Sequence, residues 1–186
     1  MPSELEIVKK LFAIQVAGNG IPEKDYALLT EQERKLLARG TASGEGAGYF
    51  LLPAARKKLT VVMTGGVFDL LHAGHVFTLT EAAKLGNFLF VVVATDETAK
   101  KSKGKLLHPL EYRLYVVKSL KPVDLAMGGL ARKEELLERA KPDVVVFGYD
   151  QNPKIVQTGN AKIVKLELDK APGILKSSKI ISSLGY

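Results

Sequence analysis

The stretch from Thr60 to Leu79 constrains the fold of this chain more than any other. It begins with apolar and β-branched residues, breaks at Gly65-Gly66, and continues after His75 with the apolar spacing of a helix. A strand, a glycine turn and a helix in that order are typical of the first βα crossover of a parallel sheet. Ligands of such sheets bind beyond the carboxyl ends of the strands. The turn between strand and helix is therefore where we expect a ligand site.

The remainder of residues 59–186 continues the alternation of strands and helices. Strands are predicted at 59–64, 88–94, 123–127, 143–147 and 162–168. Helices are predicted at 74–85, 109–120, 132–140 and 177–184, with a polar, lysine-rich loop over 95–108. This order predicts an α/β fold: a Rossmann-like, doubly wound, parallel five-stranded sheet with right-handed connections.

Residues 1–58 are expected to form a separate, small helical unit ahead of the domain at 59–186. The pattern predicts helices at 4–16, at 22–29 and from the capping box Thr30-x-x-Glu33 to about Ala38, a short strand at 49–52, and a linker at 53–58. Helices followed by a glycine loop and a strand resemble a reduced winged-helix unit. Because these helices carry mixed charge, we expect a structural or dimerising role and consider contact with nucleic acid unlikely.

The composition excludes several classes of function. The chain contains no cysteine, which rules out disulfides, thiolate metal sites and thiol catalysis. Its apolar runs are too short to span a bilayer, and its start lacks a signal-peptide pattern, so we expect a cytoplasmic protein without membrane contact. The net charge of +7 lies mainly in residues 59–186. Such an excess suits polyanionic small substrates or nucleic acid.

The chain has three histidines, and two of them, His72 and His75, stand three residues apart at the predicted helix start. A helix N-terminus offers unpaired N–H groups and attracts phosphate, and two imidazoles there add donors that are cationic when protonated. Gly74, Gly65 and Gly66 are expected to let the backbone approach a ligand closely. Positioning and charge stabilisation are nearly all that phosphoryl or nucleotidyl transfer requires of a protein.

The same residues carry a family resemblance. Gly66, Phe68, Asp69, His72, Gly74 and His75 resemble the Gly-x-Phe-Asp-x-x-His-x-Gly-His signature of the cytidylyltransferase-like nucleotidyltransferase superfamily. The resemblance implies transfer of a nucleotidyl group from Mg²⁺-bound ATP or CTP to a small phosphorylated acceptor. It implies a catalytic role for His72 and His75 on the phosphates. The nucleotide-binding positions expected in this stretch are Thr64, Gly65, Gly66, Val67, Phe68, Asp69 and Gly74.

Further positions follow from the resemblance. The lysine-rich loop supplies Lys103 or Lys105 as a functional lysine, and Glu111-Tyr112-Arg113 supplies Arg113 as a contact to substrate phosphate. The remaining nucleotide-binding positions expected are Gly148, Tyr149, Asp150, Gln151, Lys176, Ser177 and Ser178. Asp69 and Asp150 are expected to assist the nucleotide's Mg²⁺, without a metal site formed by the protein alone.

The resemblance to the superfamily leaves open both the nucleotide, ATP or CTP, and the acceptor substrate. Gly148-Tyr149-Asp150-Gln151 and the Ser-Ser-x-Ile ending look more like archaeal FAD synthetases, which adenylylate FMN, than like glycerol-3-phosphate cytidylyltransferases. A CTP-dependent cytidylyltransferase acting on an alcohol phosphate is the alternative. A non-catalytic, nucleotide-sensing DNA-binding protein is an alternative of another class. We expect the protein to work as a homodimer.

Overall fold

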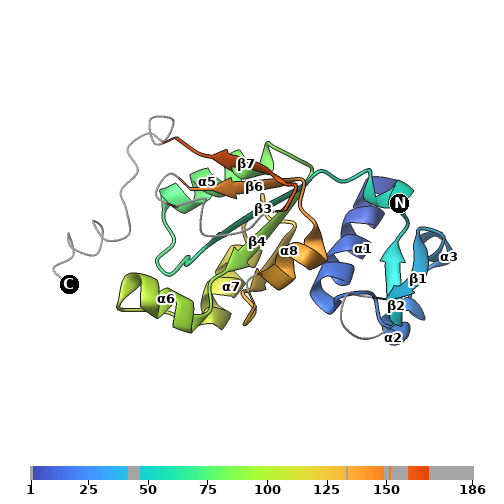
Figure 1. Cartoon of the computed structure of the whole chain (residues 1–186), viewed down its shortest axis with the longest axis horizontal. Helices are drawn as coiled ribbons and strands as arrows, with labels where there is room; N and C mark the ends of the chain where they lie inside the picture. The colour runs from blue at the N-terminus through green and yellow to red at the C-terminus, as the bar shows by residue number, and fades with distance from the viewer. Residues whose placement is uncertain (1, 42–46, 133, 149–150, 152–158, 168–186) are drawn as a thin grey trace.

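The computed structural model describes residues 2–41, 47–132, 134–148, 151 and 159–167, except for the side chains of Ala47 and Lys103. The first part contains α1 (Glu4–Gly18), α2 (Glu23–Tyr26), α3 (Glu31–Arg34), β1 (Leu37–Thr41), β2 (Ala47–Leu51) and α4 (Pro53–Arg56). The second contains β3 (Val61–Gly66), α5 (Ala73–Ala83), β4 (Phe88–Val93), α6 (Asp96–Lys103), α7 (Leu110–Lys118), β5 (Leu125–Gly128), α8 (Glu134–Ala140), β6 (Val144–Phe147) and β7 (Lys162–Lys165). Figure 1 shows the first part at one end of a twisted sheet and α6 at the other.

The sheet confirms the predicted α/β class. Its five strands are parallel and lie in the order β5-β4-β3-β6-β7. The chain starts in the middle at β3, adds β4 and β5 on one side, and returns to add β6 and β7 on the other. The point at which this order reverses lies between β3 and β6, which is where open α/β sheets bind their ligands.

Both faces of the sheet are covered by apolar packing. Because side chains alternate along a strand, Val61 and Met63 of β3 face one side and Val62 the other. Helices α5 and α7 cover the side of Val62 through Leu79, Ala82 and Val117. The opposite side is covered by α8, through Leu136 and Ala140, and by α1, which contributes Ile7, Val8, Leu11, Phe12 and Val16. Burial on both faces explains why the strands are continuous apolar runs.

Helix α1 is thus part of the core that surrounds the sheet. A capping box between Ser3 and Glu6 opens it, and Phe12 packs edge-on against Phe88 of β4 with ring centroids 5.0 Å apart. The last turn of α1 has no basic residue of its own, and Arg139 of α8 donates to the carbonyl of Ala17 there. That residues 1–58 form a separate unit remains a prediction. In the structure, one apolar cluster contains both residues of α1 and residues of the sheet.

Two local predictions in residues 1–58 were wrong. The helix that begins after Thr30 ends at Arg34 instead of about Ala38, and Leu37–Thr41 pairs antiparallel with β2. The pairing uses the backbone groups that a longer helix would have needed, so the hairpin ends the helix. The expected linker at 53–58 contains α4, which Pro53 opens at a position where a missing N–H has no cost.

The expected loop at 95–108 was also wrong, because it contains α6. Thr95 caps this helix by accepting the N–H of Thr98, and Asp96 and Glu97 lie in its first turn. Lys101 pairs with Glu97 one turn earlier, at 2.7 Å. These local signals favour a helix despite the polar composition. The predicted strand 162–168 ends at Lys165, and the predicted helix at 177–184 lies outside the described residues.

No helix within the described residues is both long enough and apolar enough to cross a membrane.

Candidate functional site

The predicted site lies at the carboxyl ends of β3 and β6, beside the reversal of strand order. Two side chains tie these strands together there. The Thr64 hydroxyl donates to the carbonyl of Val146 at 2.9 Å. Gln151 accepts the N–H of Gly148 with Oε1 and donates from Nε2 to the carbonyl of Gly65, both at 2.8 Å. Of the predicted nucleotide-binding residues, Thr64 and Gln151 therefore shape the floor of the site.

The turn after β3 contains a strained backbone at Phe68. Its φ of 54° is in the left-handed region, which is rare for a bulky residue and costs of order 1–3 kcal/mol. Burial of the Phe68 ring, which lies 5.2 Å from the ring of His75, holds this conformation. A Cβ at Gly66 would lie 2.9 Å from the Phe68 ring. Gly66 therefore makes room for Phe68, whereas the sequence suggested that it makes room for the ligand.

His72 and His75 lie together, as the spacing predicted, with ring centroids 4.0 Å apart. They also form the capping box of α5. His72 is the N-cap, and its Nδ1 accepts the N–H of Gly74 at 3.1 Å. The N–H of His72 points back to Nδ1 of His75 at 3.4 Å. Two histidines thus take the places that Ser or Thr and Glu usually occupy.

This capping arrangement determines the tautomer of both rings. A nitrogen that accepts a hydrogen bond carries no proton, so Nδ1 is unprotonated in each ring and Nε2 carries the N–H. With this tautomer each imidazole is neutral and has Nε2–H as its donor group, beside the N-terminus of α5. The sequence suggested donors that are cationic when protonated, whereas the geometry favours neutral donors that the helix cap holds in a fixed orientation.

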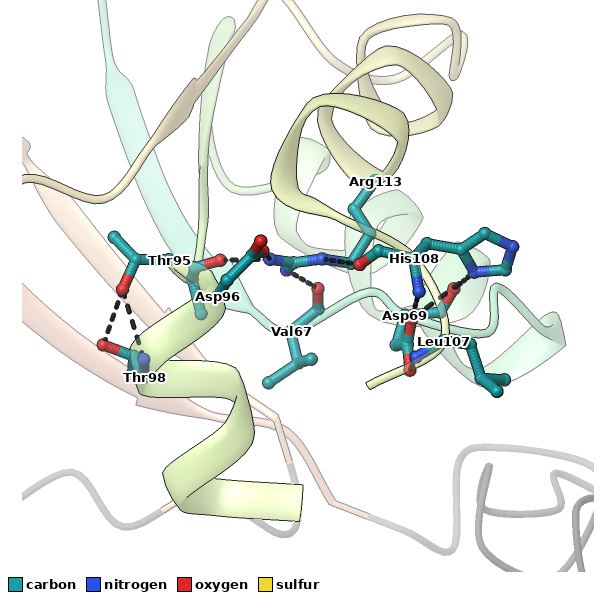
Figure 2. Close-up of polar contacts among 9 residues, drawn as sticks. Val67, Asp69, Thr95, Asp96, Thr98, Leu107, His108 and Arg113 are labelled. Atoms are coloured by element: carbon teal, nitrogen blue, oxygen red, sulfur yellow. Dashed lines mark hydrogen bonds and ion pairs between the residues drawn. The ribbon is translucent and has the colours of Figure 1, made fainter. Parts of the chain in front are cut away.

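A lysine-bearing segment lies beside the histidine turn. Asp69, three residues before His72, accepts the N–H of Leu107 with Oδ2 and that of His108 with Oδ1, both at 2.8 Å (Figure 2). Lys105 is exposed two residues before the first of these contacts, and its functional role stays a prediction. The side chain of Lys103 lies outside the described part of the chain.

Arg113 occupies a different environment from the one the sequence suggested. The guanidinium is buried, with 1% of the residue exposed. Figure 2 shows it donating to three backbone carbonyls and one carboxylate. Nε donates to His108 at 3.0 Å, Nη1 to Val67 at 2.6 Å, and Nη2 to Ala94 at 2.8 Å and to Asp96 at 2.7 Å. A contact with substrate phosphate remains a prediction; in the structure this arginine joins three loops.

The magnesium-assisting role expected for Asp69 stays a prediction; in the structure each of its carboxylate oxygens accepts one backbone N–H. Among the residues that the structure describes, no three His, Asp or Glu side chains lie together in a way that suits a metal ion. Tyr149, Asp150, Lys176, Ser177 and Ser178, also expected in the site, lie outside the described residues.

An open cavity of about 660 Å³ lies beside this site, past the carboxyl ends of β4 and β5. Its lining combines hydroxyl groups with one ion pair and comprises Thr95, Glu97, Thr98, Lys101, Ser102, Leu130 and Ala131. The hydrogen bond from Lys101 lowers the pKa of Glu97 below its ordinary value. Sequence reasoning missed this cavity because it assigned the segment to a loop. Thr95 with Asp96 and Glu97 was the available signal of a helix start.

Residues 63–180 match the profile of a family described as Cytidylyltransferase-like. A FAD synthase of Pyrococcus horikoshii is 39% identical over 139 residues, which span 69% of this chain and 93% of that relative. A FAD synthase of Aciduliprofundum boonei is 48% identical over 93 residues, which span 48% of this chain and 61% of that relative.

A solved structure shares the fold. The crystal structure of a lipopolysaccharide core biosynthesis protein from Thermoplasma volcanium superposes with a TM-score of 0.54 at 37% identity. The match covers 59% of this chain and 97% of that protein. The residues that match the family profile include the histidine turn.

Proposed function

The chain belongs to the cytidylyltransferase-like family, and we propose that it transfers AMP from Mg-ATP to FMN, forming FAD and pyrophosphate. It is an enzyme of the nucleotidyltransferase class. The observation that carries the proposal is the histidine capping box, which presents two Nε2–H donors at the N-terminus of α5 beside the reversal of strand order. FMN as the acceptor is supported by the FAD synthases that the chain resembles.

The proposed reaction is an in-line displacement at the α-phosphorus of ATP. A phosphate oxygen of FMN attacks that phosphorus, the bond to the β-phosphate oxygen breaks, and pyrophosphate leaves with the bonding electron pair. Negative charge spreads over the phosphate oxygens during the transfer. Nε2–H donors fixed by the cap stabilise that charge without having to reorient.

The helix and the cations add to this stabilisation. The unpaired N–H groups of the first turn of α5 attract phosphate, and Lys105 brings a positive charge to the same end of the sheet. Magnesium is part of the substrate, since Mg²⁺ usually remains on the phosphates of a triphosphate with few protein ligands. The two carboxylate oxygens of Asp69 each accept a backbone N–H of the segment that follows Lys105.

We place the acceptor on the side of β4 and β5. The triphosphate belongs at the reversal between β3 and β6, so the acceptor has to approach from a neighbouring opening. The cavity lined by Thr95, Thr98 and Ser102 is such an opening, and its volume is within the range of small-molecule sites. Its hydroxyl groups suit the phosphate or ribityl hydroxyls of FMN.

The test is a pyrophosphate-release screen of ATP and CTP, each against FMN, glycerol-3-phosphate and phosphocholine. We expect turnover with ATP and FMN, and FAD as the product by mass. Turnover with CTP and an alcohol phosphate only would replace the proposed substrates while keeping the reaction class. If no pair reacts and the protein binds duplex DNA in a salt-sensitive way, the proposal is wrong and the sensor alternative gains support.

We also propose a homodimer that pairs through the outer face of α7. Tyr112, Tyr115 and Val116 lie on this face at i, i+3, i+4 spacing and are exposed, Tyr115 by 76%. Glu111 and Lys118 flank them seven residues apart, so antiparallel pairing places Glu111 of one copy opposite Lys118 of the other. Sedimentation velocity should show a dimer for the wild type and a monomer for Tyr115→Glu. Two identical sedimentation coefficients would contradict the pairing.

A further inference from the structure

Both backbone polar groups of His108, its N–H and its carbonyl, form hydrogen bonds with side chains at the site. Its N–H donates to Asp69 Oδ1 at 2.8 Å, and its carbonyl accepts from Nε of Arg113 at 3.0 Å. The ring takes part as well, with Nδ1 at 3.1 Å from the carbonyl oxygen of Asp69. His108 itself is exposed, so apolar burial does not hold this peptide in place. The hydrogen bonds do (Figure 2).

Asp69 and Arg113 both connect this peptide to the histidine turn. Asp69 belongs to the turn itself, since it directly follows the buried and strained Phe68. Arg113 donates to the carbonyl of Val67 in the same turn and to Ala94 and Asp96 after β4. Three segments distant in the sequence are thus joined at one point. These contacts keep a charged, exposed segment close to a rigid turn.

The segment they hold is the one that carries Lys105. Gly104, which precedes it, has a φ of 78° and open space around it, so α6 ends there and the chain turns freely. The next fixed point is the N–H of Leu107 on Asp69 Oδ2 at 2.8 Å. Together with the N–H of His108 on Oδ1, this contact holds the backbone that follows Lys105 against the turn of Asp69.

We propose that Asp69 is a positioning residue that docks the Gly104–Pro109 segment, and with it Lys105, onto the histidine turn, while Arg113 locks the same peptide from the other side. This inference rests on the proposed function, because it assigns Lys105 to the triphosphate. It differs from the sequence-based expectation that Asp69 binds nucleotide or assists magnesium. The carboxylate acts through two backbone N–H groups instead of touching the substrate.

The functional test is a double-mutant cycle of Asp69→Asn and Lys105→Ala. An amide keeps the shape of the carboxylate but has only one acceptor oxygen, so one of the two N–H bonds is lost. We expect Asp69→Asn to lower kcat/KM for ATP about 10-fold in the wild type and less than about 2-fold in Lys105→Ala, since coupled residues are not additive. Equal effects in both backgrounds would overturn the proposal.

A second result would overturn it as well. If raising the Mg²⁺ concentration restores the activity of Asp69→Asn, the carboxylate acts on the metal and not on the segment. The matched control is Asp124→Asn, because Asp124 Oδ2 accepts the N–H of Leu89 at 2.7 Å at the opposite end of the sheet. We expect this control to lower the free energy of unfolding without changing kcat/KM.

Docking can also be measured without any transfer reaction, by the rate of tryptic cleavage after Lys105. Anchored backbone resists proteases, whereas released segments are cut. Asp69→Asn should raise this rate several-fold at 25 °C, and Asp124→Asn should leave it unchanged. If no nucleotide pair reacts but cleavage rises as expected, the docking stands and the proposed function fails. If transfer is intact and cleavage does not change, the docking fails.

Discussion

At the amino ends of the strands, Asp124 and Asp143 each accept the N–H of a strand residue, Leu89 and Val61, at 2.7 Å. Each also pairs with a cation from residues 1–58: Asp124 with Lys9 at 2.9 Å, and Asp143 with Arg56 at 3.2 Å. At the carboxyl ends, Asp69 accepts two N–H groups and Asp96 pairs with Arg113. Both ends of the sheet therefore use carboxylates that bond to backbone and cations.

The difference lies in what these bonds hold. At the amino ends they join strand starts to Lys9 of α1 and Arg56 of α4. At the carboxyl ends they join loops to one another, and those loops carry His72, His75 and Lys105. A change at the amino ends should lower stability and leave transfer alone. A change at the carboxyl ends should do the reverse.

The strongest test of the carboxyl end is His75→Ala, which should lower turnover by about 10²–10³-fold, as expected for loss of one fixed donor to developing charge. Two further variants distinguish the roles of Nδ1 and Nε2 of His75. His75→Asn keeps an acceptor near the position of Nδ1 for the N–H of His72 but has no group at Nε2, so it should be as impaired as His75→Ala. His75→Gln reaches the position of Nε2 with an amide N–H and should retain more activity.

The measurement is initial rate with saturating ATP and FMN, together with unfolding in urea. We expect the free energy of unfolding to change by less than about 1 kcal/mol, the usual value of one helix cap. Near wild-type turnover in His75→Ala would remove the histidine from the mechanism. Equal activities for the Asn and Gln variants would show that the tautomer derived from the cap is irrelevant to transfer.

The matching test at the amino end is Phe12→Ala. Phe12 is buried against Phe88, and the guanidinium of Arg56 lies 5.1 Å from the centroid of its ring, so its loss leaves a cavity between α1 and the sheet. The free energy of unfolding should fall by about 3 kcal/mol, whereas Phe12→Leu should lose less. Turnover of the folded protein should stay within about 2-fold of the wild type. A large fall in turnover at full folding would show that α1 also shapes the active site.

Much of the sheet and of the histidine turn was predictable because the signals are local. Apolar runs of strand length and a glycine turn indicated β3 and α5, and the fold confirmed them. The capping box at Thr30 was predicted and is present. The missed helix α6 also had local signals, in the cap of Thr95 and the Glu97–Lys101 pair, but its polar composition outweighed them in the prediction.

What was not predictable depends on distant partners. Arg113 was predicted only as a contact to substrate phosphate, and its burial follows from carbonyls 46 and 19 residues away. Gly66 was assigned to ligand approach because the position of the Phe68 ring is not visible in the sequence. The packing of α1 on β4 likewise depends on a contact between Phe12 and Phe88. Periodicity shows which face is apolar but not what covers it.

The smallest effect on stability is expected at Glu33, in the helices of residues 1–58. Hydrogen bonds from the Lys10 side chain and then from the Thr30 backbone lower the pKa of Glu33 from 4.5 to about 2. A lowered pKa means that ionised Glu33 stabilises the fold above pH 4.5 and loses this contribution as the pH falls from 4.5 toward 2. Glu33→Gln keeps an oxygen for the capping box but loses the charge that Lys10 contacts at 2.7 Å.

We therefore expect Glu33→Gln to be less stable than the wild type by about 1 kcal/mol at pH 7, since the partner lysine is half exposed and solvent weakens the pair. Urea unfolding between pH 7 and pH 3 should show this difference shrinking on the acid side, with turnover at pH 7 unchanged. Lys10→Met is the matched variant and should behave in the same way. A difference that grows toward pH 3, or a loss of turnover, would mean that the contacts of residues 1–58 reach the carboxyl ends of the sheet.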